Sequence, residues 1–418
     1  MIVSLAELLI LSILVDWAFR RLSIPGLVGM LLLGVAFGPY MLGWISPGLM
    51  TASADLRLLA LIVILLRAGF ELSKDTLNRV GFRVMLLSAI PATIEGVAIT
   101  FMGPPLLGLS YLESAILGAV LGAVSPAVVV PLMIRFIDRN MGTEKGIPTL
   151  VLAASSIDDV YVIVIYSILV GILTGQSVNV AWSLAGIPIS IVLGIGVGLI
   201  VGLVLYRLFR RFSPDTAKRV LVVLALSILL VRIEHLSAQW VPFAALLAVM
   251  AIGFIILEKD EHMAHELSAK FGHIWVFAEI VLFTMVGAEV NIEVAIRAGL
   301  AGALLIAGGL VARSIGTWLC LIKSDLNRGE RWFVVISYIP KATVQAAIGG
   351  GALAALKVAG MDTGPGEVIL AVAVLSILLT APVGAWAIMI AGDRWLAVAP
   401  PSVHDEMDAA LESEAEKI

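Results

Sequence analysis

The sequence predicts an all-α protein that crosses a membrane many times. Of its 418 residues, 60% are hydrophobic and only 14% are charged, and the mean hydropathy is +1.06. Because a soluble domain carries about 25% charged residues, this composition excludes a soluble globular protein. The apolar segments and the basic residues between them define the arrangement further. The single cysteine, Cys320, excludes an intrachain disulfide bond and a cysteine-rich metal site.

Thirteen apolar segments are long enough to be transmembrane helices. A helix rises about 1.5 Å per residue, so roughly 20 apolar residues cross the hydrocarbon core. The first segment has no basic stretch before it, which predicts a membrane helix rather than a cleaved signal peptide. In order, the segments are 2–19, 25–43, 56–73, 84–109, 112–136, 147–174, 181–208, 219–236, 240–257, 271–292, 298–322, 331–356 and 366–391.

The basic residues between these segments predict the orientation. Eighteen Lys and Arg residues lie on the side reached after the odd-numbered segments, and four lie on the other side. Since basic loops stay in the cytoplasm, the N-terminus is expected outside and the C-terminus inside. We therefore expect a multi-pass protein of the cell inner membrane. The acidic tail after the last segment is too short for a nucleotide-binding or catalytic domain.

The thirteen segments divide into two halves of six around the single segment 181–208. Seven crossings separate the starts of the halves, so the second half enters the membrane inverted, as in secondary transporters. Helices at matching positions should then be broken in both halves. The fifth segment contains Pro126 after Ser125, and the twelfth contains Pro340 before Lys341. Two crossed, broken helices would expose backbone N–H and C=O groups to an ion near the midplane.

Two adjacent carboxylates, Asp158 and Asp159, lie near the middle of the sixth segment. An ionised side chain at this depth costs at least about 2.5 kcal/mol, so intramembrane carboxylates are functional candidates. Neighbouring residues point about 100° apart around a helix. One carboxylate can therefore line a water-filled cavity while the other faces a partner helix. The alternative is that both are structural and held in buried ion pairs, although one basic partner cannot easily satisfy two diverging carboxylates.

Other polar residues within the segments are candidates for supporting roles. Glu95 and Arg313 occupy corresponding positions in the two halves, and we expect a buried pair that acts mainly as a structural clamp. Arg313 could also reach Asp158. Lys341 could compensate a half-helix end or a carboxylate. Hydroxyl oxygens are ligands that alkali cations accept, and those nearest the breaks and the aspartates belong to Ser125, Ser155, Ser156 and Thr343.

The seventh segment carries a tandem GxxxG spacing at Gly194, Gly198 and Gly202. Small residues at this spacing let helix backbones approach closely. The pattern predicts close helix packing, with a homodimer interface as one possible use of it.

Four stretches together resemble the monovalent cation:proton antiporter superfamily, and most of all the NHA-type branch of sodium/proton antiporters. This branch occurs in bacteria and animals, and the chain is assigned here to the bacterial side. The similarity extends from the first segment to the last. The stretches are 122–131, 144–149, 156–159 and 340–348.

The resemblance implies a dimerisation domain, a six-helix ion-translocating core with crossed broken helices, and elevator-like transport. By resemblance, Asp159 carries the cation and the proton. Asp158 is the neighbour that pairs, in electrogenic relatives, with a lysine on the helix equivalent to the eleventh. Here that helix carries Arg313, and an arginine is not expected to release its proton, which leaves the proton:cation stoichiometry open.

The resemblance also implies a division of the chain. The scaffold or dimerisation helices of the first half are 1–82, and its core helices are 83–174. The linker helix and second set of scaffold helices are 175–258. The second set of core helices, with an adjoining helix, is 259–395, followed by the acidic cytosolic tail 396–418.

The expected function is exchange of Na⁺ or Li⁺ for protons in pH homeostasis, with cation and proton competing for Asp159 and Asp158. Removal from water favours the neutral form of a carboxyl group, so one site can hold a proton or a cation. The expected partners are membrane lipid, these ions and a second copy of the chain, with no cofactor, nucleic acid or enzymatic activity. A sodium-coupled symporter of an organic anion is the main alternative. An intramembrane aspartyl protease is disfavoured, because adjacent aspartates on one helix diverge.

Overall fold

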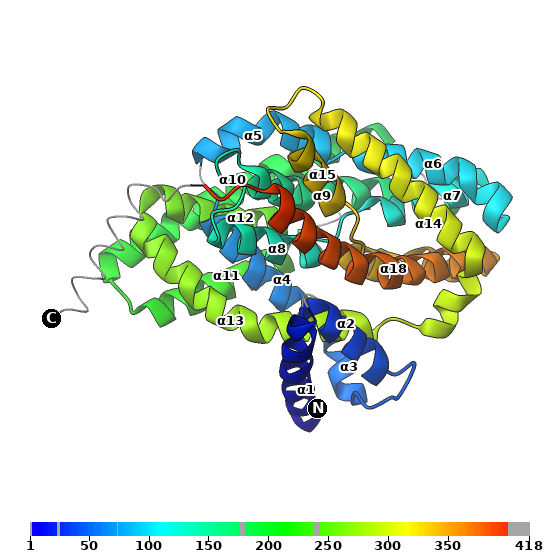
Figure 1. Ribbon diagram of the computed structural model, residues 1–418, viewed down its shortest axis with the longest axis horizontal. Helices are drawn as coiled ribbons and strands as arrows, with labels where there is room; N and C mark the ends of the chain where they lie inside the picture. Colours follow the sequence, from blue (N-terminus) through cyan, green and yellow to red (C-terminus); the bar gives the residue numbers. More distant parts are fainter. Residues whose placement is uncertain (1, 23–25, 73, 176–179, 238–242, 400–418) are drawn as a thin grey trace.

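The computed structural model describes residues 2–22, 26–72, 74–175, 180–237 and 243–399. Within these ranges every named element is an α-helix, and the only β contact is the isolated bridge between Met141 and Val398. The predicted all-α class is confirmed. Figure 1 shows an elongated body in which long helices lie beside one another.

The described helices vary from short turns to full membrane spans. They are α1 (Ile2–Arg21), α2 (Gly26–Phe37), α3 (Pro47–Thr51), α4 (Ser53–Phe70), α5 (Lys74–Leu87), α6 (Ile90–Leu107), α7 (Tyr111–Gly122), α8 (Pro126–Asp138), α9 (Ile147–Leu173), α10 (Val180–Phe212), α11 (Thr216–Ser237), α12 (Ala245–Lys259), α13 (Glu261–Ala288), α14 (Ile292–Leu321), α15 (Arg328–Ser337), α16 (Thr343–Ile348), α17 (Gly351–Val358) and α18 (Gly364–Trp395).

Each of the thirteen predicted segments coincides with one or more of these helices. Eight helical spans in the described ranges are long and apolar enough to cross a membrane. The protein is therefore polytopic, while the number of thirteen crossings stays a prediction. The second segment is shorter than expected, because α2 ends at Phe37 before Gly38 and Pro39. The residue that precedes a proline disfavours the helical conformation.

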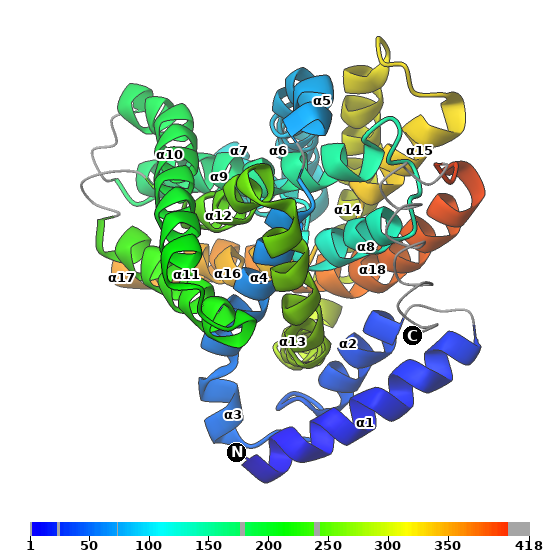
Figure 2. The same cartoon turned by 90° about the vertical axis from the view of Figure 1, so that its left-hand side faces the viewer.

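One group of helices consists of α2, α4, α10, α11, α12 and α13. In it α13 packs against α2 and α4, and α12 packs against α4 and α10. Helix α1 lies at the edge of the body, along α2 (Figure 2). It leaves half of its large apolar side chains exposed. We call these helices, with α1, the scaffold group.

The glycines of α10 lie against α12 of the same chain. A Cβ at Gly198 would stand 2.3 Å from the carbonyl oxygen of Ala248, and one at Gly194 would stand 2.4 Å from that of Ala244. The prediction of close helix packing is confirmed. This face is filled by α12, so it is not open to a second copy, and the suggestion of a dimer interface at the glycines is wrong.

The second group contains the predicted core helices, including the two that are expected to be broken. Helix α6 packs against α7 and α14, α14 packs against α18, and α9 contacts α5, α7 and α8. We call α5 to α9 with α14 to α18 the core group. Its two halves share a local feature: α7 begins with a capping box formed by Ser110 and Glu113, and α15 begins with one formed by Asn327 and Glu330.

Two ion pairs join α8 of the core group to the scaffold group. Arg67 on α4 lies 2.6 Å from Asp138, and Arg135 lies 2.9 Å from Glu279 on α13. Both pairs use residues from the C-terminal end of α8. Of the tail predicted at 396–418, only residues up to 399 lie within the described ranges, so its predicted character remains untested.

Candidate functional site

The two proline breaks cross at the centre of the core group. Helix α7 ends at Gly122 and α8 begins at Pro126, while α15 ends at Ser337 and α16 begins at Thr343. Between them, the backbone N–H of Ser125 donates to the carbonyl oxygen of Pro340 at 3.0 Å. The prediction of two broken helices that cross is confirmed. A proline supplies no N–H to the preceding turn, which favours an interruption beside it. Pro126 is the first residue of α8, and Pro340 lies in the break between α15 and α16.

The end of α7 is completed by side chains from the second half of the chain. The last four carbonyls of a helix have no partner within it. Here the carbonyls of residues 120–123 all accept hydrogen bonds: Gln345 donates to the first and the last at 3.0 Å, Lys341 to the second and Arg313 to the third. The negative end of this half-helix thus faces two cations and an amide, which stabilise it.

A cluster of four charged side chains lies beneath this helix end. Glu95 on α6 lies 2.7 Å from Arg313 through one carboxylate oxygen and 2.7 Å from Lys341 through the other. Arg313 also lies 3.3 Å from Asp158. All four side chains are at most 1% exposed. The predicted contact between Glu95 and Arg313 is confirmed, and the cluster holds two cations and two carboxylates.

The two adjacent aspartates have different surroundings. Asp158 is fully buried and accepts a hydrogen bond from the backbone N–H of Val124 at 2.8 Å, so it links α9 to the break between α7 and α8. Asp159 is partly exposed and lines a cavity of about 150 Å³ together with Pro126 and Ser156. One of its oxygens has no hydrogen-bond partner among the described residues. The divergence predicted for neighbours on one helix is therefore present.

The hydroxyl groups proposed from the sequence are distributed unevenly. Ser125 is buried, and its Oγ lies 3.4 Å from the Oγ1 of Thr343, so these two hydroxyls meet where the breaks cross. Ser155 is also buried, donates to the carbonyl of Leu152 and does not line the cavity. Ser156 lines it instead. Around the helix, position 155 lies between the two aspartates and position 156 lies on the side of Asp159 away from Asp158.

Sequence reasoning missed two residues of this region. Gln345 lies in one of the four stretches that carry the family resemblance, but its hydrogen bonds to α7 cannot be predicted from spacing along the chain. Glu234, near the end of α11, lines the cavity with Asp159 and accepts a hydrogen bond from Ala245 N at 3.3 Å. Its only signal was an acidic residue at the end of an apolar segment, which is typical of a solvated loop.

Comparisons with known proteins point to one family and one fold. A family model described as sodium/hydrogen exchanger, transmembrane, matches residues 8–390. The chain is 34% identical to human sodium/hydrogen exchanger 9B2 over 356 residues, which cover 82% of this chain and 64% of the relative. It is 30% identical to human sodium/hydrogen exchanger 9B1 over 389 residues, which cover 89% and 73%. The chain thus spans somewhat less than two thirds of the length of 9B2.

A solved structure has the same fold. The sodium proton antiporter MjNhaP1 from Methanocaldococcus jannaschii, determined at pH 8, superposes with a TM-score of 0.73. The match covers 93% of this chain and 97% of that chain, at 23% sequence identity. At this identity the likeness shows the fold, which is the antiporter fold that the resemblance had implied.

Proposed function

The chain belongs to the sodium/hydrogen exchanger family, and from this premise we propose that it exchanges a monovalent cation, Na⁺ or Li⁺, for protons across a membrane. The family consists of transporters and not enzymes. The observation that supports the proposal best is the pair Asp158 and Asp159, of which one is held in the charged cluster and one lines a cavity.

Asp159 is the proposed carrier of both ions. It has a carboxylate oxygen without a hydrogen-bond partner among the described residues, in a small cavity lined mainly by apolar side chains. A carboxylate in such surroundings is stabilised either by a proton or by a bound cation, so the two compete. Asp158 already accepts a hydrogen bond from Val124 and lies beside Arg313. We propose that it shapes the site and contributes to cation binding without being the main carrier.

Hydroxyl oxygens at the crossing complete the proposed cation site. Ser125 and Thr343 lie together at the two breaks, and Ser156, which lines the cavity, replaces Ser155 as the proposed ligand on α9. Glu234 lines the same cavity at the junction between α11 and α12. A second carboxylate raises the local concentration of cations, so we propose that Glu234 attracts them toward Asp159.

Alternating access is proposed to occur by elevator-like movement of the core group past the scaffold group. The cavity supports this proposal, because Asp159 and Pro126 of the core group face Leu61 and Ala244 of the scaffold group across it. In this scheme α13 is the adjoining helix of the segment 259–395, since it packs against α2 and α4. The ion pairs of α8 would form and break during each cycle.

The proposed setting is the cell inner membrane, with the N-terminus outside and the C-terminus in the cytosol, and the proposed assembly is a homodimer. The exposed apolar face of α1, which includes Ile10, Ile13 and Trp17, offers an alternative to the glycine face that α12 fills. Light scattering of the purified protein should give a protein mass of twice 44.2 kDa. A mass of one chain would contradict the dimer and leave the exchange proposal unaffected.

The exchange proposal is tested in proteoliposomes that carry a pH gradient. Addition of Na⁺ or Li⁺, without any organic anion, should dissipate the gradient, measured as dequenching of acridine orange. A requirement for an organic anion would favour the symporter instead. Repeating the assay with an imposed potential reports whether exchange moves net charge, which is the question raised by Arg313.

The assignment of the two aspartates is tested by comparing Asp159→Asn with Asp158→Asn at matched reconstitution. Asp159→Asn should abolish exchange at every pH between roughly 6.5 and 9, because it removes both the cation ligand and the exchangeable proton. Asp158→Asn should weaken apparent cation affinity and retain some exchange. Retained exchange in Asp159→Asn together with an inactive Asp158→Asn would reverse the assignment.

A further inference from the structure

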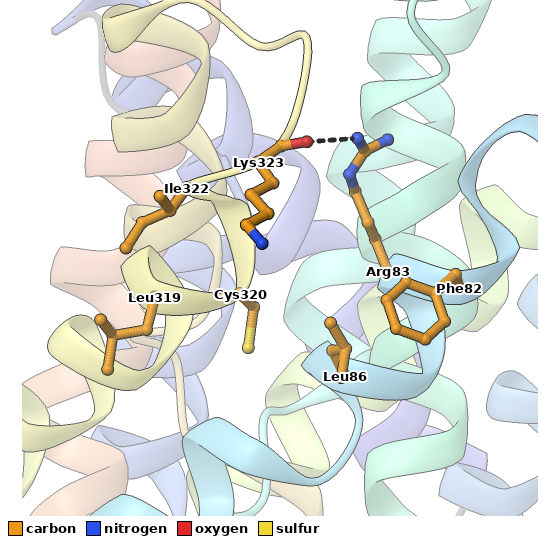
Figure 3. A pocket seen from close by; sticks show the side chains of 7 residues that line it. All are labelled: Phe82, Arg83, Leu86, Leu319, Cys320, Ile322 and Lys323. Carbon is orange, nitrogen blue, oxygen red and sulfur yellow. Dashed lines mark hydrogen bonds between the residues drawn. The ribbon is translucent and has the colours of Figure 1, made fainter.

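A pocket outside the proposed ion site opens on the side of the core group between α5 and α14 (Figure 3). Its volume is about 430 Å³. Figure 3 shows that α5 contributes Phe82, Arg83 and Leu86, while the end of α14 and the residues after it contribute the opposite wall. We call it the Arg83–Lys323 pocket.

The charged side chains of this pocket are both basic. Arg83 donates from Nη2 to the backbone carbonyl oxygen of Lys323 at 2.9 Å, which joins the two walls, while the Lys323 side chain points into the space between them (Figure 3). Lys323 is exposed, and no ion pair involving it is found in the part of the chain that the structure describes. The pocket lining contains no carboxylate. Two cations without a counter-charge attract an anion.

The rest of the lining is apolar and faces outward. Phe82 is 77% exposed, and Leu319 and Ile322 are each 51% exposed. These residues lie where the membrane-spanning helix α14 ends, next to the ring pair of Trp318 and Trp332, whose centroids are 5.0 Å apart. Tryptophan is enriched at the boundary between lipid headgroups and acyl chains, so the pocket is placed at headgroup depth.

We propose that the Arg83–Lys323 pocket binds an anionic phospholipid from the surrounding membrane. The phosphate would lie against Arg83 and Lys323, and an acyl chain would run along Phe82, Leu86 and Leu319. Basic pockets between membrane helices on the cytoplasmic side are suited to anionic headgroups. Guanidinium binds phosphate oxygens through a planar pair of donors, which makes Arg83 the main anchor.

A second pocket at the opposite end of α14 provides an internal comparison. It has a volume of about 720 Å³ and is lined by the end of α6 and the start of α14 and α18. Its arginine is Arg297, near the start of α14. Glu367 also lines this second pocket. One cation and one carboxylate give no net attraction for an anion.

A lipid in the Arg83–Lys323 pocket would act on the helices that hold the charged cluster. Glu95 lies on α6, directly after α5, and Arg313 lies on α14. A molecule that contacts α5 and the end of α14 together stabilises their packing. Occupancy should therefore raise the thermal stability of the whole protein, since a ligand that binds only the folded state shifts unfolding by mass action.

The test titrates purified protein in detergent with dioleoyl phosphatidylglycerol, with dioleoyl phosphatidylcholine as the neutral lipid and inorganic phosphate as the free anion. Bound lipid is counted by native mass spectrometry and the unfolding temperature is measured in parallel. Phosphatidylglycerol should bind and raise the unfolding temperature, whereas the other two should not. The double variant Arg83→Gln with Lys323→Gln should bind phosphatidylglycerol about thirtyfold more weakly, equivalent to ~2 kcal/mol for two basic residues.

The matched control is Arg297→Gln, which removes the arginine of the second pocket and should leave binding of phosphatidylglycerol unchanged. If the double variant does not fold, Lys323→Gln alone, at an exposed position, should weaken binding about fivefold. Equal binding by the variants and the parent, or an equal loss in Arg297→Gln, would overturn the proposal. Stabilisation by inorganic phosphate alone would also overturn it, because the occupant would then be a free anion.

Discussion

At Glu95 one carboxylate is shared by two buried cations, Arg313 and Lys341. A single pair would leave the second cation without a counter-charge in a region closed to water, where an isolated ion is costly. The same two cations also donate to the end of α7. Glu95 therefore determines where both donors lie, and it affects the helix break without touching it.

Replacing Glu95 by alanine should destabilise the protein strongly. Loss of one partner of a buried ion pair typically costs about 3–5 kcal/mol. Here Lys341 loses its carboxylate partner, and Arg313 keeps only the longer contact with Asp158. The unfolding temperature in detergent should fall markedly, while cation selectivity of the remaining folded protein changes little. Glu113→Ala, in the exposed capping box of α7, is the control, with an expected loss of only ~1 kcal/mol. An unfolding temperature like that of the parent would refute the clamp role of Glu95.

Replacing Gln345 by leucine should also lower stability, because two carbonyls at the end of α7 lose their donor. A buried polar group left unpaired costs about 1–3 kcal/mol. Ala347→Leu, at an exposed position of the same helix, should have little effect. The comparison is made by thermal unfolding at matched lipid content. Equal stability of the two variants would show that these bonds contribute nothing.

The chemistry of these residues explains which of them could be predicted from the sequence. Charged residues in apolar segments are rare, so Asp158, Asp159, Glu95 and Arg313 were apparent, and so was the pairing of the last two. The hydrogen bonds of Gln345 depend on where another helix ends in space. The choice between Ser155 and Ser156 depends on which helix packs on each side of α9, and spacing along the chain does not contain that information.

At the level of elements, α10 and α12 approach so closely that three glycines are required. A Cβ at Gly202 would stand 2.3 Å from Ile255 and 3.0 Å from Ile252. The other glycine of this region, Gly196, has nothing within 4 Å of the position its Cβ would occupy. Along α10, the glycines in contact with α12 therefore alternate with Gly196, which lies on the opposite face.

This alternation gives a matched pair of substitutions. Gly198→Ala should lower the unfolding temperature, since its Cβ would overlap the backbone of Ala248 and force the helices apart. Gly196→Ala should be neutral or slightly stabilising, because alanine favours a helix over glycine by about 1 kcal/mol. Circular dichroism during heating would compare them. If both variants behave alike, the close contact is not important for stability.

Helix breaks were predictable where proline causes them and not elsewhere. Pro126 and Pro340 predicted the two central breaks. The separation of α16 from α17 and the non-helical backbone of Gly299, with φ 56°, carried no comparable signal. Glycine adopts positive φ without strain but is also common in membrane helices, so its presence alone does not predict a break.

Across the whole molecule, two ion pairs join α8 of the core group to α4 and α13 of the scaffold group. If the core group moves, Arg67 and Asp138 must separate. The test places cysteines at these two positions in a Cys320→Ser background and joins them with a short bifunctional thiol reagent. Exchange should stop once the two cysteines are cross-linked. Full exchange after complete cross-linking would contradict elevator-like movement.

The control for this experiment joins two helices of the scaffold group. Arg57 on α4 and Glu289 after α13 lie 2.6 Å apart, the same separation as in the tested pair. Cysteines at these positions should cross-link equally well and leave exchange intact. An equal loss of exchange in the control pair would mean that cross-linking damages the protein in general.

The completion of α7 by Arg313, Lys341 and Gln345 has a consequence for biosynthesis. While the ribosome is still translating the middle of the chain, the end of α7 is already in the membrane, and its partners follow 191 to 225 residues later. Unpaired carbonyls in hydrocarbon cost several kcal/mol each, so the first half cannot reach its final conformation alone. Nascent chains that stop before Arg313 should therefore be degraded, and the final structure of the first half should form only after α16 has been inserted.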